Sequence, residues 1–300
     1  MSRIVCTGAF PPNSKNLWIT RSLLDACNYS CHYCPIKKNE FASKETIFHV
    51  IDFLSNIKDR DIEITLFGGE PTLHPQFEFI VEKLSQFCTV TIFTNLSAKS
   101  ELYNKIGCLL SVSYHPDMIS AERFIDKLSK IDKSLIGFIN VMDVNEYDSE
   151  VSKVCKYCRD EEIIHRLAPV CSIGEKSKLL KSVLYSKRPD VKGYNDTLIV
   201  TEDSKKLYTD QECKFSGLTN WNGYICYKGY SAFFIDHHGN IFKCLMDQQT
   251  GNSLSIDSDM SEIFRIEESC PYDSCICENY LPKEISYGLC NEHLRDILYE

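Results

Sequence analysis

The chain has 300 residues, of which 43% are hydrophobic and 25% charged, and its formal net charge is -9. A chain of this composition and length buries a sizeable core. Its negative charge repels phosphate backbones and anionic lipids, which argues against a dedicated nucleic-acid or membrane-surface protein. The N-terminal residues lack the apolar run of a signal peptide. No stretch approaches the roughly 20 apolar residues that span a bilayer. We therefore expect a cytosolic protein.

Predicted strands and helices alternate through the first half of the chain. Short β-branched or apolar runs predict strands, and apolar residues recurring every three or four positions predict helices. Strands are predicted at 17–24, 62–67, 90–94, 109–114, 135–142 and 163–167, and helices at 43–58, 76–87, 99–106, 120–131 and 149–159. Such alternation predicts a parallel sheet covered by helices. Six repeats are too few for a closed eight-stranded barrel. The predicted fold class is α/β, an open partial (βα)6 TIM-like barrel.

Beyond residue 170 this alternation stops. Residues 176–214 are polar and charged, with one strand-like piece at Thr197–Thr201. Residues 232–236 and 241–244 then predict a β-hairpin, whose turn contains Gly239 because glycine tolerates a positive φ. We expect a barrel core over 1–170, a linker or irregular insertion over 171–212, and a small cysteine-rich α+β domain over 213–300.

Three of the sixteen cysteines, Cys27, Cys31 and Cys34, lie within eight residues after the first predicted strand. Disulfides do not persist in the cytosol, so clustered cysteines there indicate metal binding or catalysis. A structural zinc or a closed iron–sulfur cluster takes four ligands, whereas three thiolates leave one iron open. The spacing C-x3-C-x2-C, with Tyr33 before the last cysteine, resembles the signature of the radical S-adenosylmethionine superfamily. The alternative is a zinc site completed by His32 or a distant ligand.

A second motif supports this resemblance. Gly68-Gly69-Glu70-Pro71 follows the second predicted strand and resembles the superfamily's GGEP motif, which binds the amino group of the methionine moiety. The resemblance implies that Tyr33 lies against the adenine and that Asn95 and Ser113 contact the methionine or ribose. Arg166 or His165 would point inward to the carboxylate, since strand alternation turns only one of them that way; Arg suits a bidentate contact better.

The resemblance also implies the chemistry. A reduced 4Fe-4S cluster donates one electron to S-adenosyl-L-methionine, and the resulting 5'-deoxyadenosyl radical abstracts hydrogen from the substrate. Flavodoxin or ferredoxin would be the electron donor.

The C-terminal cysteines resemble an auxiliary-cluster domain. Cys226-x12-Gly239-x4-Cys244 is similar to the opening of SPASM and Twitch domains. Downstream, C-x4-C-x-C departs from the SPASM pattern, which favours one auxiliary 4Fe-4S cluster. The expected ligands are Cys226, Cys244, Cys275 and Cys277, with Cys270 in reserve. The alternatives are a structural zinc, or two clusters that also use Cys213 and Cys290.

For the remaining candidate residues, a purely structural role competes with a functional one. Cys171 follows the sixth predicted strand and would donate or accept hydrogen at the substrate, or simply pack. Structural roles are expected for the other isolated cysteines and histidines: Cys6, Cys88 and Cys108 as small buried hydrophobes, Cys155 and Cys158 within a helix, His74 and His115 as turn or packing residues, and His237 and His238 as solvated hairpin residues.

The function predicted is a radical SAM oxidoreductase or modifying enzyme for a small-molecule or peptide substrate, with the auxiliary cluster aiding oxidation. We expect no recognition domain before the first strand, which favours a free small substrate or a separate recognition protein. The alternatives are a maturase of ribosomal peptides, glycyl-radical activation, nucleic-acid modification, or a non-catalytic iron–sulfur or zinc protein.

Overall fold

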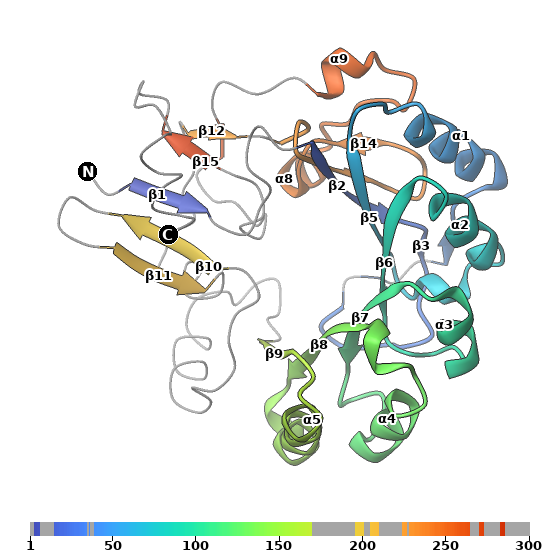
Figure 1. The fold of residues 1–300 in the computed structure, drawn as a ribbon, viewed down its shortest axis with the longest axis vertical. Helices are drawn as coiled ribbons and strands as arrows, with labels where there is room; N and C mark the ends of the chain where they lie inside the picture. Colours follow the sequence, from blue (N-terminus) through green and yellow to red (C-terminus); the bar gives the residue numbers. More distant parts are fainter. Residues whose placement is uncertain are drawn as a thin grey trace. The chain divides into compact units, whose positions relative to one another are not determined.

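An eight-stranded, mostly parallel sheet forms the framework of the protein (Figure 1). The computed structural model describes residues 3–6, 15–34, 36, 39–169, 196–200, 205–209, 224–226, 228–264, 270–272 and 283–285. The strands in spatial order are β14 (Ile241–Phe242), β13 (Ala232–Ile235), β2 (Asn16–Ser22), β5 (Asp61–Phe67), β6 (Cys88–Thr94), β7 (Leu109–Tyr114), β8 (Ile136–Asp143) and β9 (His165–Pro169). From β5 to β9 every neighbouring pair is parallel. The open α/β barrel expected from the sequence is confirmed.

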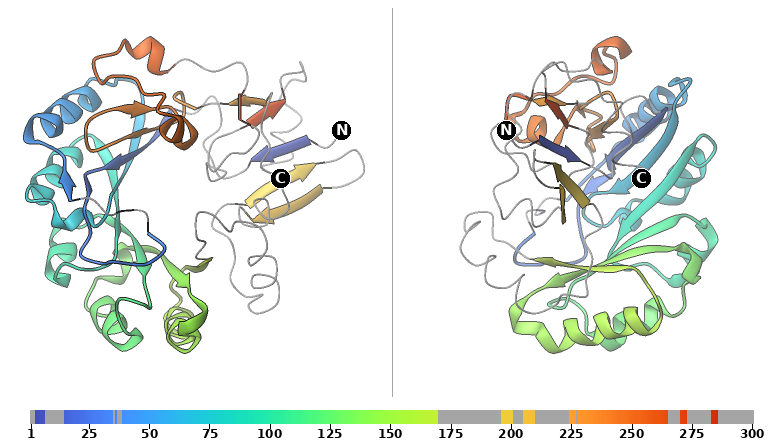
Figure 2. Two further views of the ribbon diagram at one scale, coloured as in Figure 1. Left: turned by 180° about the vertical axis from the view of Figure 1, so that it is seen from behind. Right: turned by 60° about the vertical axis from the view of Figure 1, so that its left-hand side comes forward.

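Five helices return the chain between these strands and lie on one side of the sheet (Figures 1 and 2). They are α1 (Lys44–Ser55), α2 (Phe77–Leu84), α3 (Ser100–Ile106), α4 (Ala121–Leu128) and α5 (Asp148–Asp160), with short 3-10 turns at Pro71–Leu73, Lys133–Leu135 and Asn145–Tyr147. Ser43 and Ser120 cap α1 and α4 by accepting a backbone N–H in the first turn. Alternate strand residues such as Ile64, Leu66 and Val112 are buried, as expected for the helix-covered face of a parallel sheet.

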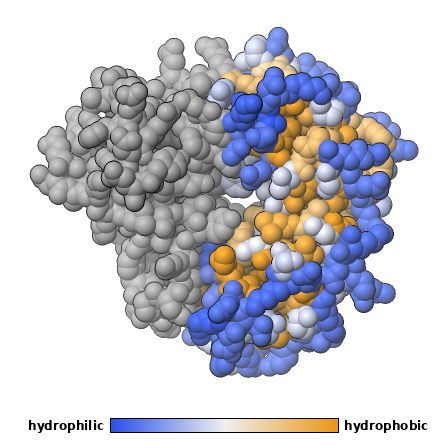
Figure 3. Space-filling model, viewed as in Figure 1, coloured by the Kyte–Doolittle hydropathy of each residue, from blue (hydrophilic) through white to orange (hydrophobic). Residues whose placement is uncertain are grey.

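The other side of the same strands carries a mixture of aromatic and small polar side chains. Trp18 Nε1 donates to Thr65 Oγ1 at 2.9 Å. Phe93 packs edge-on against Phe138 with ring centroids 6.1 Å apart. Figure 3 shows hydrophilic residues along the helices at the outer edge and hydrophobic residues gathered over the strands toward the middle of the view. This inner face therefore offers stacking surfaces as well as hydrogen-bonding groups.

The predicted hairpin is present as β13 and β14. Gly239 adopts a φ of +92° in its turn, and Asp236 N donates to Asn240 O at 3.0 Å. The prediction that both turn histidines are solvated is wrong for His237, whose side chain is only 12% exposed and lies against Glu40. Tertiary packing of the turn onto a distant strand explains this difference.

The chain folds as two compact units. One unit comprises residues 18–192 and 234–241 and contains the barrel strands and helices. It also includes β3 (Leu24–Asp25), which pairs with β4 (Glu40–Phe41). None of the helices within the described ranges is long and apolar enough to cross a membrane.

The other unit comprises residues 1–17, 193–233 and 242–300. It contains the antiparallel sheet β1 (Arg3–Cys6), β10 (Asp196–Val200) and β11 (Lys205–Thr209). It also contains β12 (Tyr224–Cys226), paired with β15 (Lys283–Ile285), and the helices α8 (Leu245–Thr250) and α9 (Met260–Ile263). The strand expected at Thr197–Thr201 is β10, whereas β1 and β11 had no clear sequence signal. The division into domains at residues 170 and 213 stays a prediction.

Candidate active site

The three clustered cysteines lie on the loop that leaves β3. Cys31 is buried, and Cys27 and Cys34 are partly exposed. Burial, together with the nearby Asp117, Cys34 and Cys27, raises the pKa of Cys31 to about 11, and a hydrogen bond with Tyr33 opposes that rise. Burial also raises the pKa of Cys27, with Cys34 again contributing. The thiols are thus close enough to interact electrostatically, and a bound metal would have to displace their protons.

The Gly68–Pro71 segment packs directly onto the start of this loop. Gly69 N donates to Leu24 O at 3.1 Å, and Glu70 N donates to Ala26 O at 2.9 Å. A Cβ on Gly69 would lie 1.8 Å from Ala26 O. Gly68, at a φ of +146°, would place a Cβ 2.3 Å from Leu24 O. Both glycines are therefore required by close contact with the protein's own backbone.

The side chain of Glu70 is fully buried and links its own segment to the end of β6. Its Oε1 accepts from Thr72 Oγ1 at 2.6 Å and from Thr94 Oγ1 at 2.9 Å. Its Oε2 accepts from Asn95 N at 2.7 Å. Burial raises the pKa of Glu70, and these hydrogen bonds oppose that rise. The carboxylate thus orients Asn95, whose Nδ2 lies 3.7 Å from Cys27 Sγ.

His115, at the end of β7, closes the opposite side of the cysteine loop. Its Nδ1 lies 3.5 Å from Cys31 Sγ and 2.8 Å from Tyr33 Oη. The Tyr33 ring stacks on the His115 ring at a centroid distance of 6.0 Å, and its hydroxyl donates to Asp117. Burial lowers the pKa of His115 to about 4. The sequence interpretation of His115 as a turn residue missed this contact with a cysteine of the cluster motif.

The zinc alternative raised by the sequence finds little support at His32. The His32 side chain is 68% exposed, and its Nδ1 lies 3.7 Å from Asp117 Oδ2. Among the described residues, the group of metal-ligating side chains that converges here is Cys31, His115 and Asp117.

A row of polar side chains crosses the inner face toward β9. Ser113 is in register with Asn140, and Asn140 with Arg166. Arg166 Nε donates to Asn140 Oδ1, and its guanidinium lies 5.6 Å from the centre of the Phe138 ring. His165 instead approaches the carbonyl of Ile163 with its Nδ1. Arg166 is therefore the one that shares the inner face, and Asn140 is a neighbour that sequence reasoning missed.

Other predicted residues lie elsewhere in the fold or outside the described part of the chain. Cys88, Cys108, Cys155 and Cys158 are buried, and His74 is buried with its Nδ1 accepting from Gln76 N. These findings agree with the packing roles expected. Cys171, Cys213, Cys275, Cys277 and Cys290 lie outside the described residues, and the structure describes only the backbone of Cys6 and Cys226.

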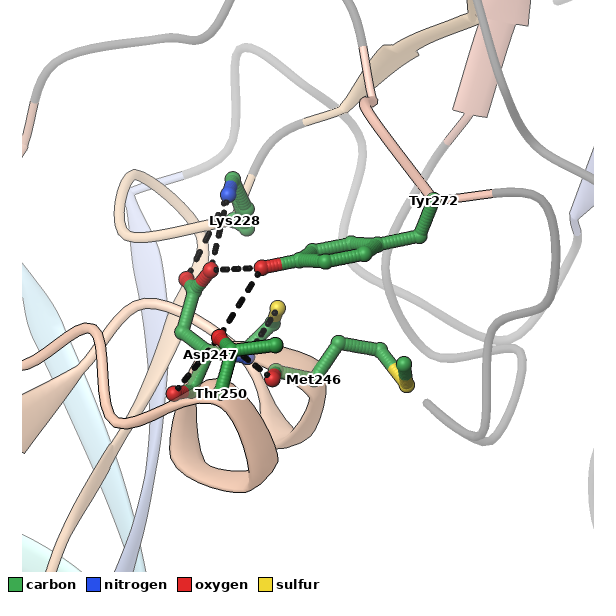
Figure 4. A network of polar contacts seen from close by, with 6 residues as sticks. Lys228, Met246, Asp247, Thr250 and Tyr272 are labelled. Atoms are coloured by element: carbon green, nitrogen blue, oxygen red, sulfur yellow. Dashed lines mark hydrogen bonds and ion pairs between the residues drawn. The ribbon is translucent and has the colours of Figure 1, made fainter.

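Two candidate auxiliary ligands, Cys244 and Cys270, are buried. Cys244 caps α8 by accepting from Asp247 N at 3.4 Å. Asp247 pairs with Lys228 at 3.2 Å, and both side chains are only 7% exposed. Tyr272 Oη donates to the same carboxylate at 2.7 Å, as Figure 4 shows. A buried, satisfied ion pair thus fixes the turn that carries Cys244.

Comparisons with known proteins find matches to the cysteine loop and to the strands after it. The radical SAM superfamily matches residues 22–164. A GTP 3',8-cyclase of Mannheimia succiniciproducens is 24% identical over 186 residues, which cover 53% of this chain and 54% of that protein. The chain thus aligns with about half the length of that cyclase.

One further relative and one solved structure match over more of the chain. The sporulation killing factor maturation protein SkfB of Bacillus subtilis is 25% identical over 289 residues, which cover 86% of this chain and 68% of SkfB. Among solved structures, native anSMEcpe with bound AdoMet and Cp18Cys peptide has a TM-score of 0.55 at 15% identity, covering 83% of this chain and 80% of that one. This last likeness concerns the fold alone.

Proposed function

Residues 22–164 belong to the radical SAM superfamily, and from this premise we propose that the chain is an enzyme that cleaves S-adenosyl-L-methionine reductively to modify a substrate. The observation that carries the proposal is the cysteine loop, on which Cys27, Cys31 and Cys34 lie within an eight-residue stretch after β3, and whose start is hydrogen-bonded to the Gly68–Pro71 segment. By contrast, Cys88 is buried on β6, Cys155 and Cys158 are buried on α5, and Cys108 is buried just before β7. This donor set fits a cluster with three protein thiolates and one open iron.

In this proposal Cys27, Cys31 and Cys34 hold the 4Fe-4S cluster, which supplies the electron that breaks the sulfonium bond. Glu70 acts through the backbone of Asn95 and positions it beside Cys27. The Gly68–Pro71 segment fixes the loop and offers backbone groups to the methionine moiety.

The polar row on the inner face supports a binding role for the rest of the cofactor. Ser113 and Arg166 share this row through Asn140. The planar guanidinium of Arg166 suits the carboxylate of S-adenosyl-L-methionine. Tyr33 offers its ring to the adenine while its hydroxyl is held by His115.

For the substrate we propose a peptide, with a small molecule as the second candidate. The similarity to SkfB, a maturation protein, extends over 86% of the chain, whereas that to the GTP 3',8-cyclase extends over 53%. The aromatic inner face, with Phe67 packed against Phe234 at 5.4 Å, suits apolar side chains better than phosphates. A cytosolic flavodoxin or ferredoxin would be the electron donor.

We propose that an auxiliary 4Fe-4S cluster assembles on Cys226, Cys244, Cys275 and Cys277, with Cys270 in reserve. Cys171 is the candidate hydrogen donor or acceptor. The buried position of Cys244 at the start of α8 supports a role as a ligand in a water-poor site.

The test is anaerobic reconstitution followed by dithionite reduction with S-adenosyl-L-methionine. We expect release of 5'-deoxyadenosine together with about eight irons per chain, or about four if the auxiliary cluster is absent. Cys31→Ala should abolish release, and Cys88→Ala, a buried cysteine on β6, should retain it. Wild-type protein with a full complement of iron and sulfide but no 5'-deoxyadenosine would overturn the proposal.

A further inference from the structure

A second group of metal-ligating side chains, distinct from Cys31, His115 and Asp117, lies within the barrel-containing unit. It consists of Glu40 on β4 and the adjacent turn residues His237 and His238. One ligand atom from each residue lies within 4.8 Å of the other two. His237 Nε2 is 3.1 Å and His238 Nε2 is 3.8 Å from the same carboxylate oxygen, Glu40 Oε2. Three residues from two distant parts of the sequence therefore converge on one point.

His237 Nε2 lies within hydrogen-bonding distance of Glu40 Oε2, and the separations of both histidines from this oxygen also suit a shared metal ion. Zinc binds imidazole nitrogen and carboxylate oxygen at about 2.0–2.2 Å, so ligand atoms in a tetrahedral site lie about 3.4 Å apart. The two observed separations bracket that value. At 3.8 Å, His238 is too far from Glu40 to hydrogen-bond. An ion between the three atoms would satisfy both imidazoles at once.

The hairpin turn holds the two histidines in place before any ligand binds. Asp236 Oδ1 accepts from the backbone N–H of His238 at 3.0 Å and of Asn240 at 2.8 Å. The Asp236 carbonyl accepts from the buried Arg21 guanidinium. The two imidazole rings lie side by side, with centroids 4.0 Å apart. Preorganisation of this kind lowers the entropic cost of binding.

We propose that Glu40, His237 and His238 bind one divalent transition-metal ion of the zinc class. Two imidazoles and one carboxylate are a ligand set that such ions take with a further position open to water. His238 is 61% exposed, so solvent reaches the site. The ion joins the hairpin turn to β4, the strand that begins six residues after Cys34. It therefore restrains β4, which follows the cysteine loop in the sequence.

The test uses the full chain, anaerobic and loaded with its iron–sulfur clusters so that the cysteines of those sites are occupied. Zinc is the probe: bound zinc per chain is measured by equilibrium dialysis and mass spectrometry. We expect wild-type protein to bind about one zinc more than the His237→Ala/His238→Ala double variant. The single variant His238→Ala, at an exposed position, should weaken zinc binding at least about 10-fold, because a lost ligand costs no less than a lost second-shell partner.

Matched controls are His49→Ala and Glu82→Gln, which change an exposed histidine and an exposed glutamate on α1 and α2. Both should bind zinc as the wild type does. Zinc-edge absorption spectra should show nitrogen and oxygen neighbours, and hydrogen exchange at Glu40 and Phe41 should slow with zinc in the wild type alone. Equal zinc binding by wild type and double variant would overturn the proposal. Sulfur neighbours around the zinc would overturn it equally.

Discussion

The tight approach between Gly69 and the cysteine loop makes Gly69→Ala an informative substitution. The new Cβ would lie 1.8 Å from Ala26 O, far inside the 3.4 Å at which ordinary contact begins, and the atom it meets is rigid backbone. Relief requires the two segments to separate, which breaks the hydrogen bonds from Gly69 N to Leu24 O and from Glu70 N to Ala26 O. Overpacking costs about 1–3 kcal/mol and each lost hydrogen bond about 0.5–1.5 kcal/mol. We expect a loss of about 2–6 kcal/mol in the free energy of unfolding.

Urea denaturation of the metal-free protein measures this loss, and iron content after anaerobic reconstitution measures its effect on the cysteine loop. Gly137→Ala is the matched control, because the three atoms nearest to its Cβ, at 3.1–3.3 Å, all belong to the movable side chain of Leu109. That control should cost less than about 1.5 kcal/mol and retain iron. If Gly69→Ala changes the unfolding free energy by less than about 0.5 kcal/mol, as exposed surface substitutions do, the reasoning is refuted.

Three further outcomes follow from the described contacts. In thermal unfolding, Lys228→Met should lower the free energy of unfolding by about 3–5 kcal/mol, because it leaves the buried Asp247 carboxylate without its ion-pair partner. Lys228→Met/Asp247→Leu should recover much of that loss. A double variant that is no more stable than the single one would contradict this. Asn95→Ala should lower iron retention by removing the contact with Cys27 Sγ, as iron assay after gel filtration would show, and unchanged retention would count against it. Tyr33→Phe should keep S-adenosyl-L-methionine affinity by equilibrium dialysis, whereas Tyr33→Ala should weaken it; equal affinities would argue against ring stacking.

The sequence predicted the barrel well because its signals are local. Period-2 and period-3.6 hydrophobic patterns mark each strand and helix, and residues such as Ser43 mark helix starts. The predicted and observed ends differ by a few residues, since terminal turns such as residues 85–87 lie outside α2. Strands β1 and β11 escaped prediction because segments of four and five residues become strands only when a partner strand lies beside them.

The sequence predicted those parts of the site that lie directly after the ends of parallel strands. Parallel strands present their carboxyl ends at one edge of a sheet, so motifs after successive strands meet there. Asn95 N donates a hydrogen bond to Glu70 Oε2, and Tyr33 Oη lies 2.8 Å from His115 Nδ1, so these segments meet in the structure. The sequence did not reveal that the side chain of Glu70 is fully buried. Its burial and its hydrogen-bond partners depend on tertiary packing. Asn140 likewise became visible only through strand register.

The cysteine loop is held from two sides by segments distant in sequence. Gly69 and Glu70 bind its beginning, while Met118 Sδ accepts from Ser30 N at 3.4 Å in its middle. Because both anchors belong to the barrel, a change that destabilises the barrel must also destabilise the arrangement of the three thiols. Thermodynamic linkage requires the converse: a cluster that binds only the folded loop stabilises the barrel in proportion to the logarithm of its affinity. The stability gained on reconstitution therefore reports how completely these anchors pre-form the loop.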